Sequence, residues 1–361
     1  MLSTEQQVEF SSHGTTCRGL FVRPVSDHPA PLIVLAHGLG GVYEMRLDAY
    51  ARRFAEAGYA ALTFDYRYFG RSDGHPRHLL VREQQQEDIE AAIAFGKTLP
   101  GVDGSKVVLW GTSLAGGHVI DVASRRSDLA ASIIQAPFTD GLASASATSF
   151  VSKIGIGILW VANVMASLLG RPPVLVPLTG PPWWPAMMSK PDVVEGVFAL
   201  LPHGSRLSGR LSRVHRRRGT KLGPHVAMSE EAEPFEIGRF VGSIILSSGT
   251  VLINGVSANF GLDIVFWRPG KNLAQVRSPM LVCACEGDSV APPGPTLTYA
   301  RRSDRCDLMV YPYGHFDIYV DEPFEVVIKD QLAFLARVVP TAIPSRAQAP
   351  VPSTPRTPDP L

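Results

Sequence analysis

A serine between small residues stands where a β-branched run gives way to helix-compatible sequence. Residues 111–117 are Gly-Thr-Ser-Leu-Ala-Gly-Gly, which places Ser113 in a Gly-X-Ser-X-small turn after the apolar run 107–110. Such a strand-to-helix turn is strained and lifts the serine Oγ towards a substrate, and only small neighbours fit beside it. Ala115 stands where glycine is usual and adds one methyl group. The pattern predicts a nucleophilic serine, and therefore a histidine base and an acid elsewhere in the chain.

An aspartate and a histidine follow two later apolar runs in the order that this chemistry requires. Asp288 follows the run 280–285 through Glu-Gly, and His315 follows the run 307–311 through Pro-Tyr-Gly. After a serine turn of this kind, the acid and then the histidine are expected on loops behind late strands. We predict that His315 accepts the Ser113 proton during acyl transfer, while Asp288 orients the imidazole and stabilises the imidazolium.

Two other aspartates are alternatives for the acid. Asp140 comes just after the apolar run that follows the serine turn, and Asp317 lies two residues beyond His315. We favour Asp288 because it follows a strand and a turn, which is the context expected for the acid.

The loop after the apolar run 31–36 is the predicted source of an oxyanion hole. It begins His37-Gly-Leu-Gly-Gly. We expect the backbone amides of Leu39 and Leu114 to donate to the oxyanion, and the ring of His37 to anchor the loop rather than to act in catalysis.

Several other polar residues are predicted to be structural. The stretch 65–74, Asp-Tyr-Arg-Tyr-Phe-Gly-Arg-Ser-Asp-Gly, is interpreted as a hydrogen-bonded turn after a strand. His118 falls one helical turn beyond Ser113 and is assigned a structural role, whereas His75 and His78 are predicted to be solvated.

The elements that position these residues alternate between strands and helices. Apolar runs at 31–36, 59–64, 107–110 and 131–135 enclose two amphipathic helices, one beginning at Leu47 and one spanning 82–98. The alternation stops after Pro137 and resumes with runs at 279–285 and 307–311 and a final helix near 324–338. This pattern predicts an α/β fold with a mostly parallel sheet covered by helices. We expect a core formed by residues 1–138 and 276–339, split by a cap at 139–275.

The cap begins with an uncharged apolar segment. Residues 154–169 lie between Lys153 and Arg171 and are fewer than the ~20 that span a bilayer. We expect a buried helix here which, together with residues 181–188, lines an apolar pocket over the active site. Membrane association through this segment is the less favoured alternative.

Composition excludes some classes of function. The chain of 361 residues has 34 basic and 33 acidic side chains, which indicates no nucleic-acid partner. The first residues lack a basic start and an apolar run, so we expect a cytoplasmic protein. The four cysteines are interpreted as reduced thiols rather than as a metal site. Neither a metal nor an organic cofactor is expected, because the serine, histidine and acid supply the chemistry.

Taken together, these motifs resemble the α/β-hydrolase superfamily. The resemblance rests on His37-Gly38, residues 64–72, the turn 111–117, Glu286-Gly-Asp288 and Gly314-His315. It is nearest to a branch of serine hydrolases related to dienelactone-hydrolase-like esterases and polyketide transferases. Dienelactone hydrolases use cysteine in the turn, and Ser113 argues against their chemistry. The resemblance implies the α/β-hydrolase fold, with a helical cap inserted after the strand that follows the serine turn.

The same resemblance makes part of the cap anomalous. Residues 205–255 show no coherent periodicity over a length that compact domains rarely leave unstructured. We hypothesise that part of this stretch is a translated intron, a lineage-specific insertion or a disordered insertion, and that its Arg216-Arg-Arg218 is an exposed cluster. The tail 340–361 is rich in Pro, Ser and Thr and is predicted to be disordered.

The expected substrate is a small-molecule ester or thioester with a fairly apolar acyl group, cleaved through an acyl-Ser113 intermediate. An acyl or polyketide transferase of secondary metabolism that uses the same intermediate is the first alternative. A catalytically inactive protein that binds a small apolar ligand is the second. A peptidase is less favoured, because the apolar cap has no evident acidic pair for a free amine.

Overall fold

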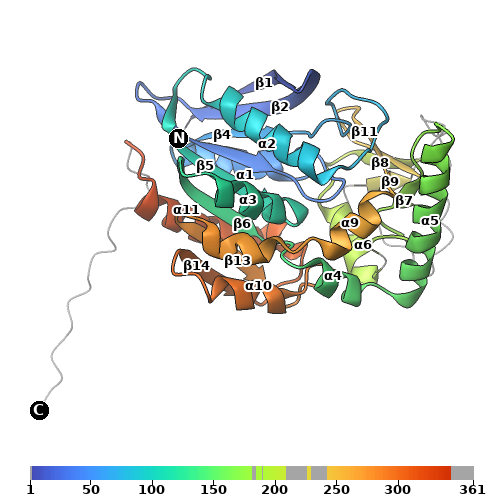
Figure 1. Ribbon diagram of the computed structural model, residues 1–361. Helices are drawn as coiled ribbons and strands as arrows, with labels where there is room; N and C mark the ends of the chain where they lie inside the picture. Colours follow the sequence, from blue (N-terminus) through green and yellow to red (C-terminus); the bar gives the residue numbers. More distant parts are fainter. Residues whose placement is uncertain (1, 181–183, 189, 209–225, 229–241, 343–361) are drawn as a thin grey trace, which may run out of the picture.

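An eight-stranded sheet forms the centre of the molecule (Figure 1). The structure is a computed structural model that describes residues 2–180, 184–188, 190–208, 226–228 and 242–342. Along the sheet the strand order is β1-β2-β4-β3-β5-β6-β13-β14. The strands are β1 (Ser3–Ser12), β2 (Thr15–Pro24), β3 (Ala30–Ala36), β4 (Ala60–Phe64), β5 (Val102–Thr112), β6 (Leu129–Gln135), β13 (Met280–Cys285) and β14 (Cys306–Tyr311).

Most of the sheet is parallel, as the alternating sequence pattern predicts. β4, β3, β5, β6, β13 and β14 pair in parallel, whereas β1 and β2 form an antiparallel hairpin that joins the sheet against β4. The hairpin turns at His13 and Gly14, which have φ angles of 47° and 80°. Positive φ at both turn residues matches the twist of a two-residue hairpin.

Helices cover both faces of the sheet and bury two separate cores. α1 (Leu47–Glu56) and α11 (Asp321–Val338) pack on one face, and α2 (Arg82–Gly96), α3 (Leu114–Arg125) and α10 (Pro293–Ala300) pack on the other. Successive residues of β3 alternate between the two cores, because side chains along a strand point to opposite faces. A strand buried on both faces appears in the sequence as a continuous apolar run, which is why 31–36 and 280–285 were recognisable.

The cap leaves the core after β6 and returns at β13. It extends from one side of the sheet (Figure 1) and combines the expected helices with small sheets. Its elements are α4 (Gly141–Ala147), α5 (Phe150–Leu168), β7 (Leu175–Pro177), α6 (Pro191–Ala199), β8 (Ser205–Ser208), β9 (Val226–Met228), β10 (Ser243–Ile245), β11 (Val251–Ile253), β12 (Gly255–Ser257), α9 (Phe260–Phe266) and the 3-10 helix η1 (Pro269–Gln275).

The anomalous stretch 205–255 contributes to the cap where the structure describes it. Strands β8, β9, β10 and β11 form one four-stranded sheet, so these short segments have the regular structure that periodicity did not reveal. Arg216-Arg-Arg218 and most of the tail 340–361 lie outside the described residues. The hypothesis that part of the stretch 205–255 is a translated intron or an insertion stays a prediction, and sequencing of the transcript tests it.

The apolar segment of the cap is a helix, but it is not buried. α5 spans Phe150–Leu168, and most of its apolar side chains are exposed. Among the described residues, α5 is the one helix that is long and apolar enough to cross a membrane. The expectation of a buried helix is therefore wrong, because composition reports how apolar a segment is and not what covers it.

Candidate active site

Ser113 occupies the sharp turn between β5 and α3. Its φ and ψ angles are 54° and −122°, a strained backbone that the surrounding contacts hold in place. The Ser113 amide donates to the carbonyl oxygen of Gln135 at 2.9 Å, and its own carbonyl oxygen accepts from the Phe138 amide at 2.8 Å. A Cβ at Gly111 would meet Val119 and the backbone of Ala115, whereas Ala115 itself is fully buried without displacing the turn. The turn therefore requires glycine at 111 and tolerates the methyl group at 115.

Three residues predicted from the sequence form one hydrogen-bonded chain. His315 Nε2 lies 3.0 Å from Ser113 Oγ, and His315 Nδ1 lies 2.6 Å from Asp288 Oδ2. The side chains of His315 and Asp288 are almost completely buried. These distances are within the range in which a histidine can take a proton from a serine while a carboxylate holds its other nitrogen.

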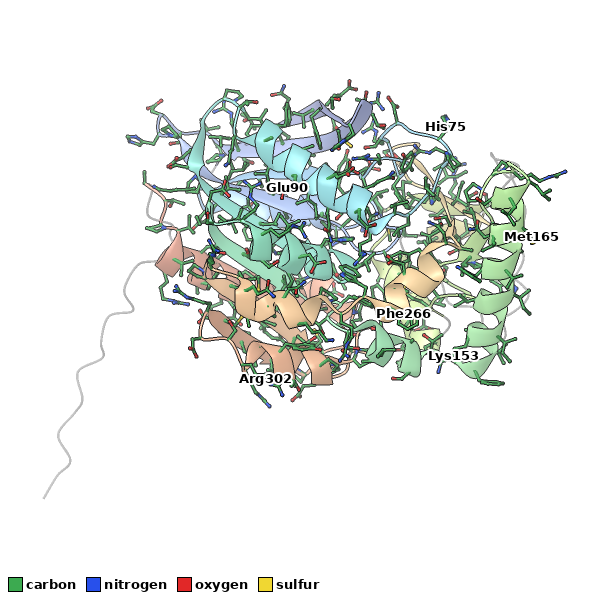
Figure 2. All side chains as sticks on the ribbon, viewed as in Figure 1. His75, Glu90, Lys153, Met165, Phe266 and Arg302 are labelled. Atoms are coloured by element: carbon green, nitrogen blue, oxygen red, sulfur yellow. The ribbon has the colours of Figure 1, made fainter. Side chains whose placement is uncertain are left out.

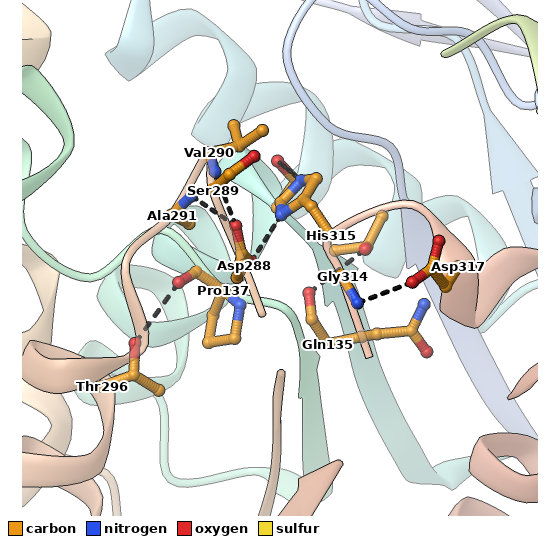
Figure 3. Close-up of polar contacts among 12 residues, drawn as sticks. Gln135, Pro137, Asp288, Ser289, Val290, Ala291, Thr296, Gly314, His315 and Asp317 are labelled. Atoms are coloured by element: carbon orange, nitrogen blue, oxygen red, sulfur yellow. Dashed lines mark hydrogen bonds and ion pairs between the residues drawn. The ribbon is translucent and has the colours of Figure 1, made fainter. Parts of the chain in front are cut away.

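The backbone of its own loop fixes the carboxylate of Asp288. Asp288 Oδ1 accepts from the amides of Val290 and Ala291 at 2.8 and 2.7 Å, which leaves Oδ2 for His315 (Figure 3). The two amides were not identified from the sequence, although a turn after an aspartate favours such bonds. The loop therefore specifies which oxygen faces the histidine.

Neither alternative acid reaches His315. Asp140 caps α4 by accepting from the Ala143 amide at 3.1 Å, and its other oxygen accepts from Arg268 at 2.7 Å. Asp317 accepts from the Gly314 amide at 2.7 Å (Figure 3). Both carboxylates are thus occupied in holding local backbone or a neighbouring arginine.

The predicted oxyanion loop lies directly against the serine. A Cβ at Gly38 would stand 2.9 Å from the Ser113 Cβ, so the loop can approach this closely only with glycine. Leu114 is the first residue of α3, and a helix leaves its first amides without a partner inside the helix. Leu39 and Leu114 both border the cavity that contains Ser113. The amides of these two residues stay our prediction for the oxyanion donors.

His37 is buried within the loop that it precedes. Its Nδ1 donates to the carbonyl oxygen of Gly38 at 3.0 Å, and its ring packs on Tyr66 with centroids 4.6 Å apart. Burial lowers the pKa of His37 to about 4, so the ring is neutral at physiological pH. These contacts are those of a loop anchor, the role expected from the sequence.

The other histidines and the turn after β4 are structural, with one correction. Asp65 accepts from the amides of Tyr43 and Arg71, which makes 65–74 the hydrogen-bonded turn that was expected. His118 is buried on α3, and its Nε2 lies 3.0 Å from Gln85. His78, predicted to be solvated, is buried and accepts from the Ile253 amide at 3.3 Å. The prediction for His78 is wrong because the cap covers a loop that would otherwise face water.

Two cavities meet at Ser113. The larger, of about 340 Å³, lies under α5 and α9, and it is lined mainly by apolar side chains. The smaller, of about 80 Å³, lies on the side of His315. Ser113, Leu39 and Met188 border both. Sequence reasoning expected an apolar pocket under the cap but did not identify the side chains in its wall, such as Trp160 and Ile264, because their placement depends on how the cap folds back.

The parallel sheet and the turn that carries Ser113 define the class of α/β hydrolases. The family model named serine aminopeptidase, S33, matches residues 27–175. The quorum-quenching protein AidA of Acinetobacter baumannii (strain MDR-ZJ06) is 39% identical over 333 residues, which are 92% of this chain and 95% of that protein. The chain therefore belongs to the α/β-hydrolase family, and it is an enzyme of that family.

Two fungal proteins resemble parts of the chain or its fold. The thiohydrolase aneE of Aspergillus aculeatus is 36% identical over 121 residues, which are 33% of this chain and 37% of that protein. The solved structure of the alpha/beta hydrolase GrgF from Penicillium sp. sh18 has a TM-score of 0.67 at 20% identity, and covers 93% of this chain and 99% of that one. At this identity the GrgF structure supports the fold of this chain alone. The polyketide transferase grgF of Penicillium sp is 32% identical over 134 residues, which are 37% of this chain and 45% of that protein.

Proposed function

We propose that the protein hydrolyses an ester or thioester with an apolar acyl group through an acyl-Ser113 intermediate. The observation that carries this proposal is the chain of hydrogen bonds from Ser113 Oγ through both nitrogens of His315 to Asp288. A hydroxyl, a base and an orienting carboxylate in this order activate a serine for attack on a carbonyl carbon.

Acylation transfers one proton through His315. Ser113 Oγ attacks the carbonyl carbon while His315 Nε2 takes the hydroxyl proton, and Asp288 stabilises the imidazolium. The amides of Leu39 and Leu114 stabilise the oxyanion of the tetrahedral intermediate. When this intermediate collapses, the bond to the leaving group breaks, and His315 returns its proton to the departing alkoxide or thiolate.

Deacylation repeats these steps with water. His315 removes a proton from a water molecule as its oxygen attacks the acyl carbon, and the protonated imidazole then returns that proton to Ser113 Oγ. The products are a carboxylic acid and the free enzyme. Every proton and leaving group is accounted for by the three side chains and water.

The larger cavity supports an apolar acyl group. Its volume of about 340 Å³ is at the lower end of the usual range for small-molecule sites, and side chains such as Phe138, Trp160 and Ile264 form its wall. Each methylene group that enters an apolar site contributes about 0.8 kcal/mol, or about fourfold in kcat/KM when the transition state keeps the contact. We therefore expect kcat/KM to rise from acetyl to hexanoyl esters.

The names of the relatives are compatible with this chemistry. Thiohydrolase aneE supports cleavage of a thioester, and the quorum-quenching AidA supports a diffusible signalling molecule as a substrate class. Cleavage of a peptide at its free amine is not supported, because the described residues that line the two cavities at Ser113 include no Asp or Glu to bind an amine.

Labelling with a fluorophosphonate tests the nucleophile. The reagent is expected to label the wild-type protein and p-nitrophenyl esters to be hydrolysed, and both reactions are expected to be lost in Ser113→Ala and His315→Ala. Asp317→Asn is the matched control, because Asp317 lies two residues from His315 but its carboxylate accepts from the Gly314 amide, whereas His315 Nδ1 is paired with Asp288. A folded wild-type protein that is not labelled would contradict the proposal.

The smaller cavity favours acyl transfer as the second candidate. It borders Ser113 and His315 next to the larger cavity and offers room for an acceptor alcohol, and the relative grgF is named a polyketide transferase. If transfer occurs, added alcohols accelerate the release of p-nitrophenol after the acylation burst, and an ester product accumulates. If the alcohol changes neither rate nor product, the acceptor is water.

A further inference from the structure

The outer face of α5 is an unusually apolar surface for a protein in water. Val151, Ile154, Ile158, Val161, Met165 and Leu168 follow one another at intervals of three and four residues, so they form a single stripe along the helix. Each is more than half exposed, as are Phe150 and Leu169. The helix contains no acidic residue. Single exposed apolar residues are ordinary, but a continuous stripe of this length marks an interaction surface.

The opposite face of α5 is fixed to the protein. Ser152 Oγ donates to the carbonyl oxygen of Trp184 at 3.3 Å, and Asn163 Oδ1 accepts from the Val174 amide at 2.9 Å. Both side chains are buried. α5 forms the outer edge of the cap (Figure 1), and the labelled Met165 lies along it (Figure 2). A helix anchored by these polar contacts can lie on an apolar surface, whereas crossing a bilayer would break the contacts.

The charges in the segment that contains α5 indicate the kind of surface. Residues 141–190 contain no Asp or Glu, but they include three cationic side chains. These are Lys153, Arg171 and Lys190, and all three are exposed. Lys153 lies in the first turn of α5 and Arg171 follows its last turn, so one cation stands near each end of the apolar stripe. Pairing α5 with a second copy would bring such cations together with no carboxylate from this segment between them, whereas anionic phospholipid headgroups would neutralise them.

We propose that the outer face of α5 binds the surface of an anionic phospholipid membrane. The helix lies in the interface, with its apolar stripe among the upper acyl chains and Lys153 and Arg171 at the phosphates. An interfacial helix needs an apolar face and a cationic rim, and α5 supplies both while its inner face stays packed on the cap.

This orientation places the acyl cavity beside the lipid. Ile156 and Trp160 on the inner side of α5 line the cavity that contains Ser113, so one helix separates it from the membrane. Together with the proposed function, on which this step rests, the arrangement favours esters that partition into lipid as substrates.

Flotation of the full chain with vesicles tests the proposal. We expect the wild-type protein to float with vesicles of phosphatidylcholine and phosphatidylglycerol, and less with phosphatidylcholine alone. Val161→Glu is expected to weaken binding at least about tenfold, because it removes an apolar contact and adds a charge that anionic headgroups repel. Arg171→Gln is expected to weaken binding about fivefold on the anionic vesicles only.

A matched control separates this face from general surface hydrophobicity. Val25 lies in the loop after β2 and is 55% exposed, close to the 54% of Val161, so Val25→Glu makes the same change elsewhere. We expect Val25→Glu to float like the wild type. Hydrolysis of p-nitrophenyl acetate in the same samples should be unchanged in all three variants, which shows that they are folded and reports on the proposed function independently of vesicle binding.

Three results would overturn the proposal. The first is a wild-type protein that does not float with anionic vesicles, and the second is equal flotation of Val161→Glu and the wild type. The third is a wild-type dimer by light scattering that Val161→Glu converts to a monomer while neither floats, which would assign the stripe to a second copy of the chain. Flotation that follows the expected pattern supports the membrane proposal even if no ester is hydrolysed.

Discussion

Replacing Asp288 with asparagine is expected to trap His315 in the wrong tautomer. Asp288 Oδ1 accepts from the amides of Val290 and Ala291, so an asparagine keeps these bonds only by placing its carbonyl oxygen there. Its NH2 group then faces His315 Nδ1 and donates to it. The imidazole proton must move to Nε2, which can no longer accept the proton of Ser113.

The size of the effect follows from the cost of escaping this arrangement. Rotating the asparagine amide by 180° would lose both backbone hydrogen bonds and place its NH2 group next to the N–H groups of Val290 and Ala291, at a cost of about 2–3 kcal/mol. No more than about 3% of the molecules would then have the productive tautomer. Loss of the carboxylate charge beside the imidazolium adds to this, and the combined decrease in kcat is expected to reach about 10⁴-fold.

Steady-state hydrolysis of p-nitrophenyl butyrate measures the effect. We expect kcat of Asp288→Asn to fall by three to four orders of magnitude while KM and the melting temperature change little, because the fold and the acyl cavity are intact. Asp140→Asn serves as the control and should keep kcat within about tenfold of the wild type, since Asp140 contacts Arg268 and α4 rather than His315. If Asp288→Asn retained a tenth of the activity, the histidine would have a different acid.

Two further predictions concern the loop beside Ser113 and the buried histidines. Gly38→Ala would place a Cβ 2.9 Å from the Ser113 Cβ, and we expect kcat to fall about 100-fold with little loss of stability, because a displacement of about 1 Å at reacting groups has this effect; Gly294→Ala, where a Cβ meets open space, should leave kcat unchanged. Acid is expected to destabilise the protein, because burial lowers the pKa of three histidines, to about 4 for His37 and to about 3 for His78 and His118, and this outweighs Asp65, whose pKa burial raises to about 7 and which offsets one histidine. Below pH 6.5 the unfolded chain binds protons that the folded chain excludes, so each histidine removes about 1.4 kcal/mol of unfolding free energy per pH unit until its folded pKa is reached. Urea midpoints measured between pH 7.5 and about pH 5 check this, and a flat profile would contradict it.

The parts of the fold that sequence reasoning predicted are those with strong local patterns. β3 and β13 are continuous apolar runs, and α1 presents Leu47, Tyr50 and Phe54 at helical spacing. The N-terminal hairpin was missed, although Val8, Phe10 and Ser12 alternate inwards before the His13-Gly14 turn. β1 is an edge strand with mostly exposed side chains, so its hydrophobic signal is weak.

The candidate site also contains residues with a local sequence signal and residues without one. Ser113, Asp288 and His315 were identifiable because each follows a strand whose pattern is local, and the sheet brings the strand ends together. The residues that line the larger cavity at Ser113 were not identifiable, because α5 and α9 come from distant parts of the cap and meet only after the chain folds back. His78 illustrates the limit, since its burial depends on contact with β11.

The cap is hydrogen-bonded to the loop that carries Asp288, so in the proposed mechanism substrate choice and catalysis are physically linked. Ser289 follows Asp288; its Oγ donates to Asp192 of α6 at 2.8 Å, and its carbonyl oxygen accepts from Lys190 at 3.2 Å. A shift of α6 would therefore act on the residue next to the carboxylate that orients His315. In the proposed mechanism the core fixes which atoms react, whereas the cap borders the cavity proposed for the acyl group and, through Ser289, contacts the loop that holds the acid. For this reason two hydrolases with the same sheet and serine turn can differ in substrate, since the sheet alone does not set the geometry of the site.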